Sequence, residues 1–455
     1  MRNNPPEFML RFLKWFCDPE LHPFIEGDLF ELYEERLEAL GKKKADRRFT
    51  IDVLLLFRPS MIRSFKYLDH LFYNFTMLQS YIKISVRSLN KHRFFAAVNI
   101  AGMTLGLTCF LLIALYIKYE YSFDKHHAQV EQLYRVGQQQ IGNDFKGSDR
   151  YAISPLPLVP TMKESFPEVE SATTLQIHEA LFVKEQQGFY EKGLFADAGY
   201  FDVFMNDELK ESGNTILEDP SNIILTRSLA KKYFGDDSAI GQDILYEGEQ
   251  MLTVQAVISD PPKNQHFQYD YITSFKNLPW YNADIGFWNH NNYRSYVRLA
   301  AGTDPSVLES KMKQFDEYTE SAYRTFSFKP DYFLQPVQDI HLHSDINFEI
   351  SANGDIRYLY LSASIALIIL LLAAINYMNL ATTRTAGQAK EVGMRKVLGA
   401  KRVQLIGQFL TESLLITAFS FGIAFFLAYL LLPSLNRLMD LDIPFELTHN
   451  PLLFA

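Results

Sequence analysis

Residues 376–412 read NYMNLATTRTAGQAKEVGMRKVLGAKRVQLIGQFLTE and separate two long apolar runs of the chain. A short basic loop between two membrane spans lies on the cytoplasmic side of the bilayer. The spacing predicts a helix over 387–398 that Gly399-Ala400 closes, followed by a second helix from Lys401. Before Glu412, the centre of this stretch sets one acidic residue, Glu391, against six basic ones: Arg384, Lys390, Arg395, Lys396, Lys401 and Arg402.

Three apolar windows are long enough, or almost so, to cross a bilayer, which takes about 20 residues of helix. They predict transmembrane helices at 95–118, 358–378 and 409–432, and Pro433 is expected to end the third. The alternative interpretation of each window is a helix buried in a protein core. Basic residues at one end of all three windows favour the membrane.

The charge bias also predicts an orientation. The first span follows Lys83, Arg87, Lys91 and Arg93, so the N-terminus is expected in the cytoplasm. Residues 119–357 then lie outside, 379–408 form a cytoplasmic segment, and 433–455 lie outside again. The apolar tail 452–455 suggests a chain that ends before a further span.

The cytoplasmic N-terminal segment, 1–77, is predicted to be helical. It is followed by an amphipathic elbow helix at 78–94, which we expect along the membrane surface rather than in a soluble bundle. Its basic and polar face carries Gln79, Lys83, Arg87, Asn90 and Lys91, and its other face carries Leu78, Tyr81, Ile82, Ser85, Val86 and Leu89.

Strand and helix signals alternate irregularly over 119–357, which predicts a large extracytoplasmic α+β domain. We expect strands at 130–140, 223–225 and 332–342, and a hairpin of 243–247 with 252–258. Helices are expected from Ser154 to about Phe166, over 227–234 with Gly235 as the stop, and from Asp304 to about Tyr318.

No catalytic constellation, cofactor site or metal site is predicted. The phosphate-binding loop G-x-x-x-x-G-K-[ST] is absent, so the chain is not expected to be an ATPase. His341 and His343 would share one face of a strand, but neither a cysteine nor a clear third ligand lies near them. Cys17 and Cys109 are not expected to pair, and the net charge of −9 argues against a nucleic-acid partner.

Two further features concern helix contacts. Gly102 and Gly106 in the first span have the small-xxx-small spacing that lets another helix approach closely. In the helix 387–398, one side carries Ala389, Val392, Gly393 and Val397, and the other carries Glu391, Met394, Arg395 and Leu398. Two contact surfaces favour a helix held between its own membrane domain and a partner. The alternative is a loop that rests on lipid headgroups.

The run Glu391-Val392-Gly393-Met394-Arg395-Lys396, followed by Leu398-Gly399-Ala400, resembles the coupling-helix region of FtsX/MacB-type ABC transporter permeases. The outer region resembles the MacB-type periplasmic core domain at 196–201, 230–235, 239–242, 254–262 and His266-Phe267. Residues 1–77 resemble the prefix domain of some bacterial FtsX-like permeases, through Pro5-Pro6 and 23–36.

The resemblance implies a multi-pass permease subunit of the bacterial inner (plasma) membrane. Such subunits pair with a separate ABC ATPase and act as homodimers or with a second permease module, in some cases with a membrane-fusion or outer-membrane partner. The family expects four spans, one more than this chain offers. One other function stays open, an FtsX-like signalling protein that activates an envelope enzyme. A membrane-anchored extracellular enzyme is disfavoured, because the sequence offers no catalytic grouping.

Overall fold

The structure is a computed structural model that describes residues 5–17, 21–57, 79–87, 90–91, 93–143, 148–184, 187–204, 209, 213–235, 238–326, 328–387, 389–399 and 402–445. The chain divides into two compact units. One unit comprises Met1–Thr104 with Ala374–Ile423, and the other comprises Leu105–Ala373 with Ala424–Ala455.

The described part of the N-terminal segment, residues 5–17 and 21–57, is mostly helical, and the rest of the predicted segment 1–77 lies outside the described residues. Helices α1 (Glu7–Phe16), α2 (His22–Leu40) and α3 (Lys42–Leu55) pack around a small core. Gly41, at φ +75°, makes the sharp turn between the second and third helices. The Tyr33 hydroxyl donates to Asp46 over 2.6 Å, so α2 and α3 are joined by a polar contact as well. The core contains Leu13, Phe16, Leu29, Tyr33, Ala45, Phe49 and Val53.

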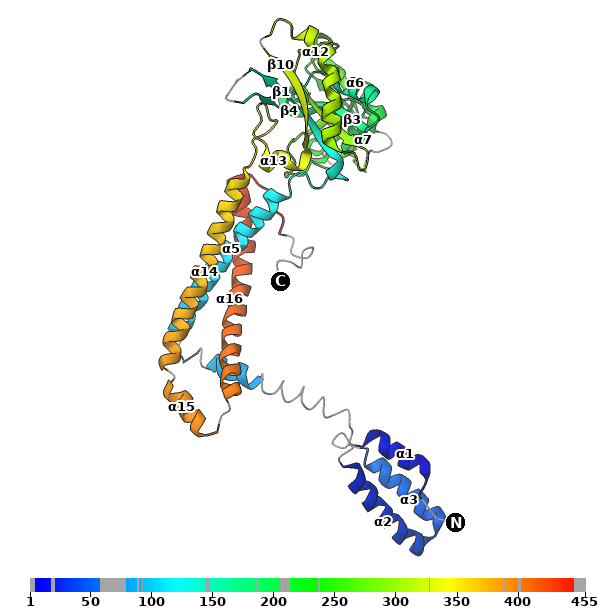
Figure 1. The fold of residues 1–455 in the computed structure, drawn as a ribbon, viewed down its shortest axis with the longest axis vertical. Helices are drawn as coiled ribbons and strands as arrows, with labels where there is room; N and C mark the ends of the chain where they lie inside the picture. Colours follow the sequence, from blue (N-terminus) through cyan, green and yellow to red (C-terminus); the bar gives the residue numbers. More distant parts are fainter. Residues whose placement is uncertain are drawn as a thin grey trace. The chain divides into compact units, whose positions relative to one another are not determined.

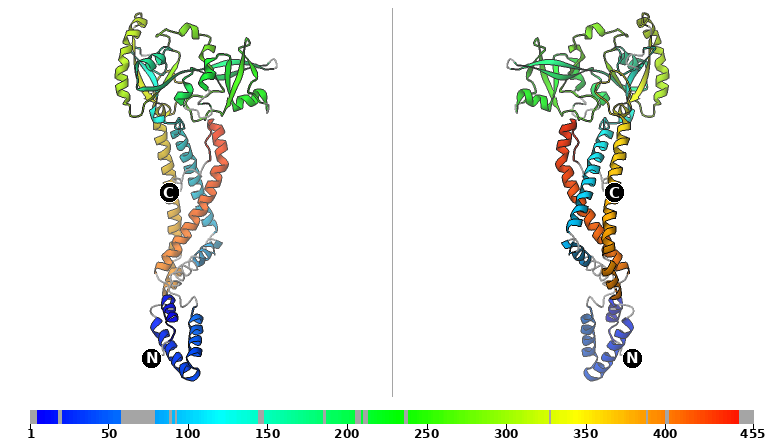
Figure 2. Two further views of the ribbon diagram at one scale, coloured as in Figure 1. Left: turned by 90° about the vertical axis from the view of Figure 1, so that its right-hand side faces the viewer. Right: turned by 90° about the vertical axis from the view of Figure 1, so that its left-hand side faces the viewer.

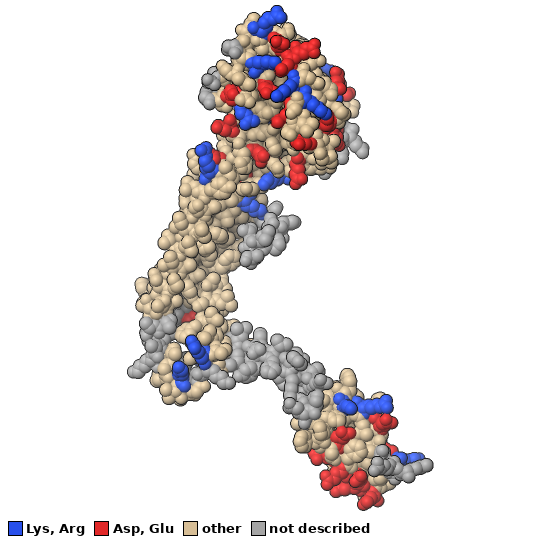
Figure 3. All heavy atoms as spheres, viewed as in Figure 1, with Lys and Arg blue, Asp and Glu red and all other residues tan. Residues whose placement is uncertain are grey.

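Among the residues that the structure describes, three helices are long and apolar enough to cross a membrane, as predicted: α5 (Arg93–Tyr121), α14 (Ile356–Gly387) and α16 (Arg402–Met439). Each extends beyond its predicted window at both ends. Figures 1 and 2 show them side by side, and in Figure 3 their visible face is mostly free of charged side chains. Many of their large apolar side chains are exposed, as expected for helices whose surroundings are lipid.

Pro433 does not end the third long helix, contrary to the prediction. Helix α16 continues through Pro433 to Met439. A proline removes one N–H donor and is tolerated within membrane helices where other groups satisfy the freed carbonyl. The helix ends instead near Asp440, which adopts a positive φ of 50°.

The outer domain is built on a ten-stranded sheet with the order β10-β1-β9-β3-β4-β8-β5-β7-β6, and with β2 paired to β1. The strands are β1 (Leu133–Ile141), β2 (Arg150–Tyr151), β3 (Val169–Lys184), β4 (Gln187–Ala196), β5 (Asn222–Thr226), β6 (Asp243–Tyr246), β7 (Gln250–Ile258), β8 (Tyr271–Ser274), β9 (Arg294–Leu299) and β10 (Lys329–Pro336).

Strand β3 belongs to two lobes. Its first half pairs with β9 and so joins the lobe of β1, β9 and β10, which α6 (Leu158–Ser165), α11 (Pro305–Met312) and α12 (Asp316–Ala322) accompany. Its second half pairs with β4 and, at its end, with β6, so that β3, β4, β8, β5, β7 and β6 close into a ring. The remaining short helices are α7 (Tyr200–Phe204), α8 (Gly213–Glu218), α9 (Arg227–Phe234), α10 (Tyr281–Asp284) and α13 (Ile340–His343).

Most predicted elements of the outer domain are present. The structure has the strand at 130–140 as β1, the helix from Ser154 as α6, and the β6–β7 hairpin with Gly248 at φ +74°. Helix α9 ends at Gly235, as predicted. The strand expected at 332–342 is wrong in its second half, because β10 stops at Pro336 and α13 follows.

Candidate functional site

The predicted coupling helix is present as α15 (Ala389–Val397), between α14 and α16. Helix α14 runs on to Gly387, so this glycine ends the preceding helix rather than starting the short one. The amide of Leu398 donates to the Met394 carbonyl over 3.0 Å, and that of Gly399 donates to the Lys396 carbonyl over 3.2 Å. Gly399 has φ +92°, the positive value predicted for the end of this helix.

Apolar side chains are exposed at the end of α15. Met394 is 57% exposed and Val397 88%, and Leu398, the residue after the helix, is 86% exposed. Two contact faces were predicted for this helix, and the structure leaves Val397 of one face and Met394 and Leu398 of the other exposed. A Cβ on Gly393 would have no atom within 4 Å. Lys396 is exposed too, so α15 offers apolar and basic groups together.

Three of the predicted coupling residues are described only in part or not at all. The backbones of Glu391 and Arg395 belong to α15, but their side chains lie outside the described part of the structure. Ala400 lies outside the described residues altogether. Their proposed roles stay predictions.

Gly102 and Gly106 lie at close contacts between α5 and α14, as their spacing predicted. A Cβ on Gly102 would come within 2.6 Å of the Asn376 side-chain nitrogen, and one on Gly106 within 2.7 Å of the Ala373 Cβ. At Gly106 the two helices approach this closely only because the position is glycine, since the Ala373 Cβ cannot move away. At Gly102 the close atom is the end of the Asn376 side chain, which can rotate.

A second face of α5 contacts α16 through hydroxyl groups. Thr104 donates to the Ser420 carbonyl and Thr108 to the Ala424 carbonyl, each over 3.4 Å. Ser420 and Ala424 are fully buried, so small side chains bring this pair of helices together as well. Helix α5 therefore packs against both other long helices.

Where α5 meets the outer domain, Asp124 is the central group of a buried polar cluster. Its amide donates to the Asn264 carbonyl over 2.9 Å, and its carboxylate lies 2.8 Å from His266 Nδ1 and accepts from the His266 amide over 3.1 Å. His266 Nε2 is 2.7 Å from the Tyr296 hydroxyl, in β9. Asp124 is fully buried and has φ +59°, a left-handed value that aspartate tolerates better than most residues.

A second pair joins the end of α5 to α13. Glu120 lies 2.8 Å from His341 Nε2, and the His341 ring stacks on Phe123 with 3.4 Å between ring centroids. The chain leading into α14 passes directly over this pair. A Cβ on Gly354 would lie 2.9 Å from His341 and 3.0 Å from Glu120.

The same lead-in to α14 is bonded to the sheet. Glu349 forms an ion pair with Arg135 of β1, which is fully buried, and one of its hydrogen bonds measures 2.8 Å. The Ser351 hydroxyl donates to the His266 carbonyl over 2.8 Å. We call the residues that fasten both chain connections to the outer domain the joint: Glu120, Phe123, Asp124, Arg135, Asn264, His266, His341, Glu349 and Ser351.

Charges within the joint shift several pKa values. Burial alone would raise the pKa of the Asp124 carboxyl, but His266 and His127 hold it well below its usual range. Burial lowers the pKa of His127, against the attraction of Asp124, whose carboxylate is 3.8 Å away. Burial likewise opposes ionisation of Glu349, but Arg135 keeps its pKa lowered. The joint therefore holds paired charges in a desolvated place.

His341 and His343 lie in a helix, not in the predicted strand, and they have separate carboxylate neighbours. His341 is paired with Glu120, while His343 is 3.7 Å from Asp339. Within the described residues, no group of three or more His, Cys, Asp or Glu side chains could hold a metal ion.

Sequence reasoning missed the joint. The resemblance of the outer region included Val254–Pro262 and His266-Phe267 but gave His266 no role. The available signal was the acidic residue Glu120 at the end of an apolar span, followed four residues later by Asp124. The partner of Glu120 is 221 residues away and that of Asp124 is 142 residues away, so local spacing could not predict the pairing.

Comparison with known proteins follows the same division of the chain. Residues 96–315 match the family model of the MacB-like periplasmic core domain, and residues 363–455 match that of the FtsX-like permease C-terminal region. An uncharacterized ABC transporter permease of Bacillus subtilis, YvrN, is 22% identical over 361 residues, which cover 74% of this chain and 83% of that protein.

The macrolide export ATP-binding/permease protein MacB of Neisseria gonorrhoeae is 23% identical over 203 residues, or 45% of this chain. The matched region spans only 29% of that protein. Among solved structures, a permease domain from Porphyromonas gingivalis covers 47% of this chain and 91% of its own, with 20% identity and a TM-score of 0.40. The periplasmic region of MacB from Actinobacillus actinomycetemcomitans covers 46% of this chain and 90% of its own, with 14% identity and a TM-score of 0.32.

Both domains that define the family are therefore matched, in the expected order and together with three candidate membrane helices. The chain belongs to the FtsX-like, MacB-type ABC transporter permeases.

Proposed function

We propose that this chain is the membrane subunit that carries ATP-driven motion from a separate cytoplasmic ATPase to the outer domain. The motion would serve export or extraction of a hydrophobic or peptide substrate. The observation that supports this best is the contrast between the exposed apolar side chains of α15 and the buried polar bonds of the joint.

The exposed side chains of α15 suit a docking surface. Met394, Val397 and Leu398 place apolar area on a short helix that also carries Lys396. Burying such side chains against a partner stabilises a complex, by roughly 25 cal/mol for each Å² of apolar surface removed from water. Gly399 ends the helix at a positive φ and so sets the direction in which it faces.

The other end of the path suits transmission. Helix α5 leads into Asp124 and Glu120, and the lead-in to α14 is held by Glu349 and Ser351. A movement of either helix end would pull on hydrogen bonds that reach β1, β9 and α13. Interfaces held by buried ion pairs resist gradual deformation, because breaking one partner away costs about 3–5 kcal/mol.

The chain itself is proposed to hydrolyse no ATP, since its sequence lacks the phosphate-binding loop. We propose that it sits in the bacterial inner membrane with its N-terminus in the cytoplasm, and that it works as a homodimer or with a second permease module. A membrane-fusion or outer-membrane partner would complete an exporter. The name of the Neisseria relative includes both export and ATP binding.

Docking through α15 is tested by recovering the ATPase with the tagged full chain from native membranes. Leu398→Glu and Met394→Glu should abolish recovery of the ATPase, and so should Lys396→Glu and Arg395→Glu if the basic residues contribute. Val307→Glu, an exposed apolar residue of α11, is the matched control and should leave recovery unchanged. Undiminished recovery with all four α15 variants would refute the docking role and favour a loop that rests on lipid.

Replacement of Gly399 tests the direction of the helix rather than its chemistry. Gly399→Val should cost about 1–2 kcal/mol locally, because a left-handed conformation strains residues with a branched Cβ. We expect normal membrane insertion and abundance with lost transport and poor recovery of the ATPase. Gly27→Val, in α2 at a glycine with no atom within 4 Å, is the control.

A further inference from the structure

A cavity of about 550 Å³ opens between the two lobes of the outer domain. Its floor includes Ala196 and Ser274, the last residues of β4 and β8, which run parallel and pair at this point. The chain leaves these two strands toward α7 and η4 (Phe275–Asn277) respectively. Crevices at the carboxyl ends of parallel strands are common ligand sites, because loops diverge there and leave space. The volume of this cavity is in the range of pockets that hold small organic molecules.

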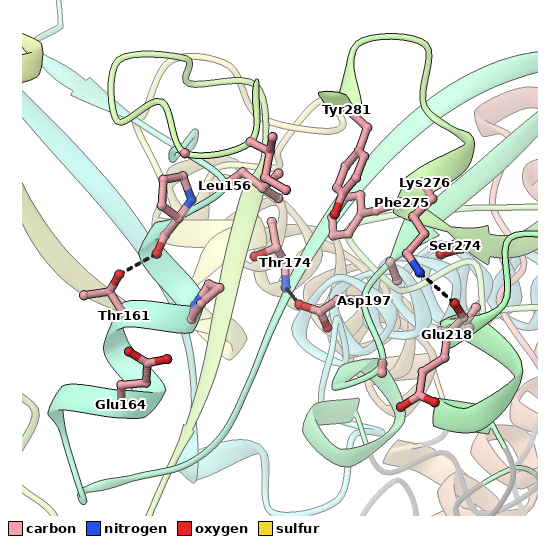
Figure 4. A pocket seen from close by; sticks show the side chains of 17 residues that line it. Leu156, Thr161, Glu164, Thr174, Asp197, Glu218, Ser274, Phe275, Lys276 and Tyr281 are labelled. Atoms are coloured by element: carbon pink, nitrogen blue, oxygen red, sulfur yellow. Dashed lines mark hydrogen bonds between the residues drawn. The ribbon is translucent and has the colours of Figure 1, made fainter. Parts of the chain in front are cut away.

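Most of the cavity wall is apolar. Helix α6 and the residues before it form one side, and α8 with the segment around α10 forms the other (Figure 4). Tyr281 projects into the space between them in this view. The apolar lining comprises Leu156, Pro157, Pro160, Ala196, Ala198, Leu217, Phe275, Tyr281 and Ile285.

Two polar groups lie side by side within this apolar wall, Thr174 and Asp197 (Figure 4). The Asp197 carboxylate accepts from the Thr173 hydroxyl over 2.7 Å and from the amides of Thr174 and Gly199 over 3.0 and 2.9 Å. The Thr174 hydroxyl, by contrast, has no hydrogen-bond partner among the described residues, although the residue is only 1% exposed. A buried hydroxyl without a partner is unfavourable, so a ligand group that reached it would gain a hydrogen bond.

The charges around the cavity are mostly negative. Glu164, Asp197 and Glu218 line it, with Lys276 as the one basic residue among the lining side chains. The Lys276 ammonium donates to the Glu218 backbone carbonyl over 3.1 Å, so it is already engaged at the rim. Burial raises the pKa of Asp197, against its hydrogen bonds from Thr173 and from two amides. A cation near this carboxylate would relieve that cost, whereas an anion would add to it.

We propose that the cavity binds a small apolar molecule that carries a protonated amine. The ammonium group would donate to the Thr174 hydroxyl and lie near the carboxylates of Asp197 and Glu164, while the apolar part fills the space between α6 and α10. The site does not depend on the coupling role of α15. Loss of ATPase docking would therefore leave this binding intact.

Three probes of the same ring system and different charge test the proposal: 1-naphthylmethylamine, 1-naphthylmethanol and 1-naphthylacetate. Each is titrated against the full chain in nanodiscs by saturation-transfer difference NMR, with empty nanodiscs subtracted. The amine should bind about tenfold more tightly than the alcohol, as a charge-assisted hydrogen bond allows. The acetate should bind more weakly than either.

Variants locate the binding in the cavity. Thr174→Val removes the free hydroxyl at nearly constant shape, and Glu164→Gln removes one exposed charge. At least one of them should lower amine affinity severalfold and leave alcohol affinity unchanged. Ala198→Phe should fill the cavity and weaken both probes. Glu320→Gln in α12 makes the same charge change outside the cavity and should alter neither.

Three results would overturn the proposal. The first is equal affinity of the amine and the alcohol for the unmodified chain. The second is amine selectivity that survives both Thr174→Val and Glu164→Gln. The third is probe binding that Ala198→Phe leaves unchanged. Asp197 is not substituted, because its hydrogen bonds to Thr173, Thr174 and Gly199 hold the local fold.

Discussion

The coupling segment (379–408) and the joint differ in whether their side chains are exposed or are buried and hydrogen-bonded. In the coupling segment, Met394, Val397 and Leu398 are exposed on α15, and Gly393 has open space around it. In the joint, Asp124, His266 and His341 are buried and bonded across elements far apart in the sequence. In the proposed function, the first is a surface that gains and loses a partner. The second is the lasting attachment of the outer domain to the helices that enter it.

The orientation predicted from the charge bias places the two regions on opposite sides of the membrane, which cysteine labelling tests in an all-or-none manner. With Cys17 and Cys109 replaced by serine, Glu320→Cys in α12 should react with an impermeant maleimide in spheroplasts. Val397→Cys in α15 should react only after the membrane is permeabilised. Both positions are exposed in the structure, so failure to react would reflect sidedness and not burial. Labelling of Val397→Cys alone in intact spheroplasts would contradict the orientation.

Loss of one side chain in the joint should destabilise the folded chain far more than loss of an exposed helix N-cap. Asp124→Ala leaves the His266 ring and amide without their buried acceptor, which should destabilise the outer domain by about 3 kcal/mol. Thermal unfolding of the full chain, followed by tryptophan fluorescence, measures the change. The control is Asp304→Ala, which removes the exposed N-cap of α11 and should cost only about 1 kcal/mol. Equal effects would mean that the joint is not a special attachment.

The contrast also explains which parts could be predicted from sequence. Three spans, the basic loop, Gly399 and the glycines of α5 follow from local composition and spacing. The same holds for α9 with its Gly235 stop and for the β6–β7 hairpin. These features depend on backbone conformation and on burial in lipid, which nearby residues determine.

The long hairpin of β3 and β4 was not predicted, although it is the most extensive pairing in the sheet. Strand β3 mixes buried and exposed residues irregularly because its two halves belong to different lobes, so it lacks a simple alternation. The joint was missed for a related reason. Its pairs join Glu120 to His341 and Asp124 to His266, and only the folded sheet brings these residues together.

The contact of α5 with α14 should respond differently to an alanine at Gly106 and to an alanine at Gly102. Gly106→Ala would bring a methyl group to 2.7 Å from the Ala373 Cβ, which is fixed to the backbone of α14. Gly102→Ala would meet only the end of the Asn376 side chain, which can rotate away. We expect a loss of about 1–3 kcal/mol for Gly106→Ala, as for other overpacked sites, and a smaller loss for Gly102→Ala.

The two alanine variants are compared by thermal stability in the same nanodiscs and by transport. Gly422→Ala in α16, where a Cβ has nothing within 4 Å, is the matched control and should change neither. If Gly102→Ala proved the more harmful of the two, the close approach of α5 to α14 would not be centred where the structure places it.

The smallest expected effect is a pH dependence caused by His127, whose ring lies 3.8 Å from the Asp124 carboxylate of the joint. Burial lowers the pKa of His127 in the folded chain from its ordinary value of 6.5, so the unfolded chain binds more protons in the window just below that pH. Stability linked to His127 is therefore complete above about pH 6.5 and is lost as the pH falls below it. The charged and titratable groups around this ring are Asp124, His126, His266 and Arg298.

Thermal unfolding between pH 7.5 and 5 should show a falling melting temperature, and His127→Asn should flatten that fall. Because the pKa of Asp124 is also lowered, a second loss should remain in the variant below about pH 4, the usual range of a carboxyl group. An unchanged slope between pH 6.5 and 5 in His127→Asn would show that another group controls it.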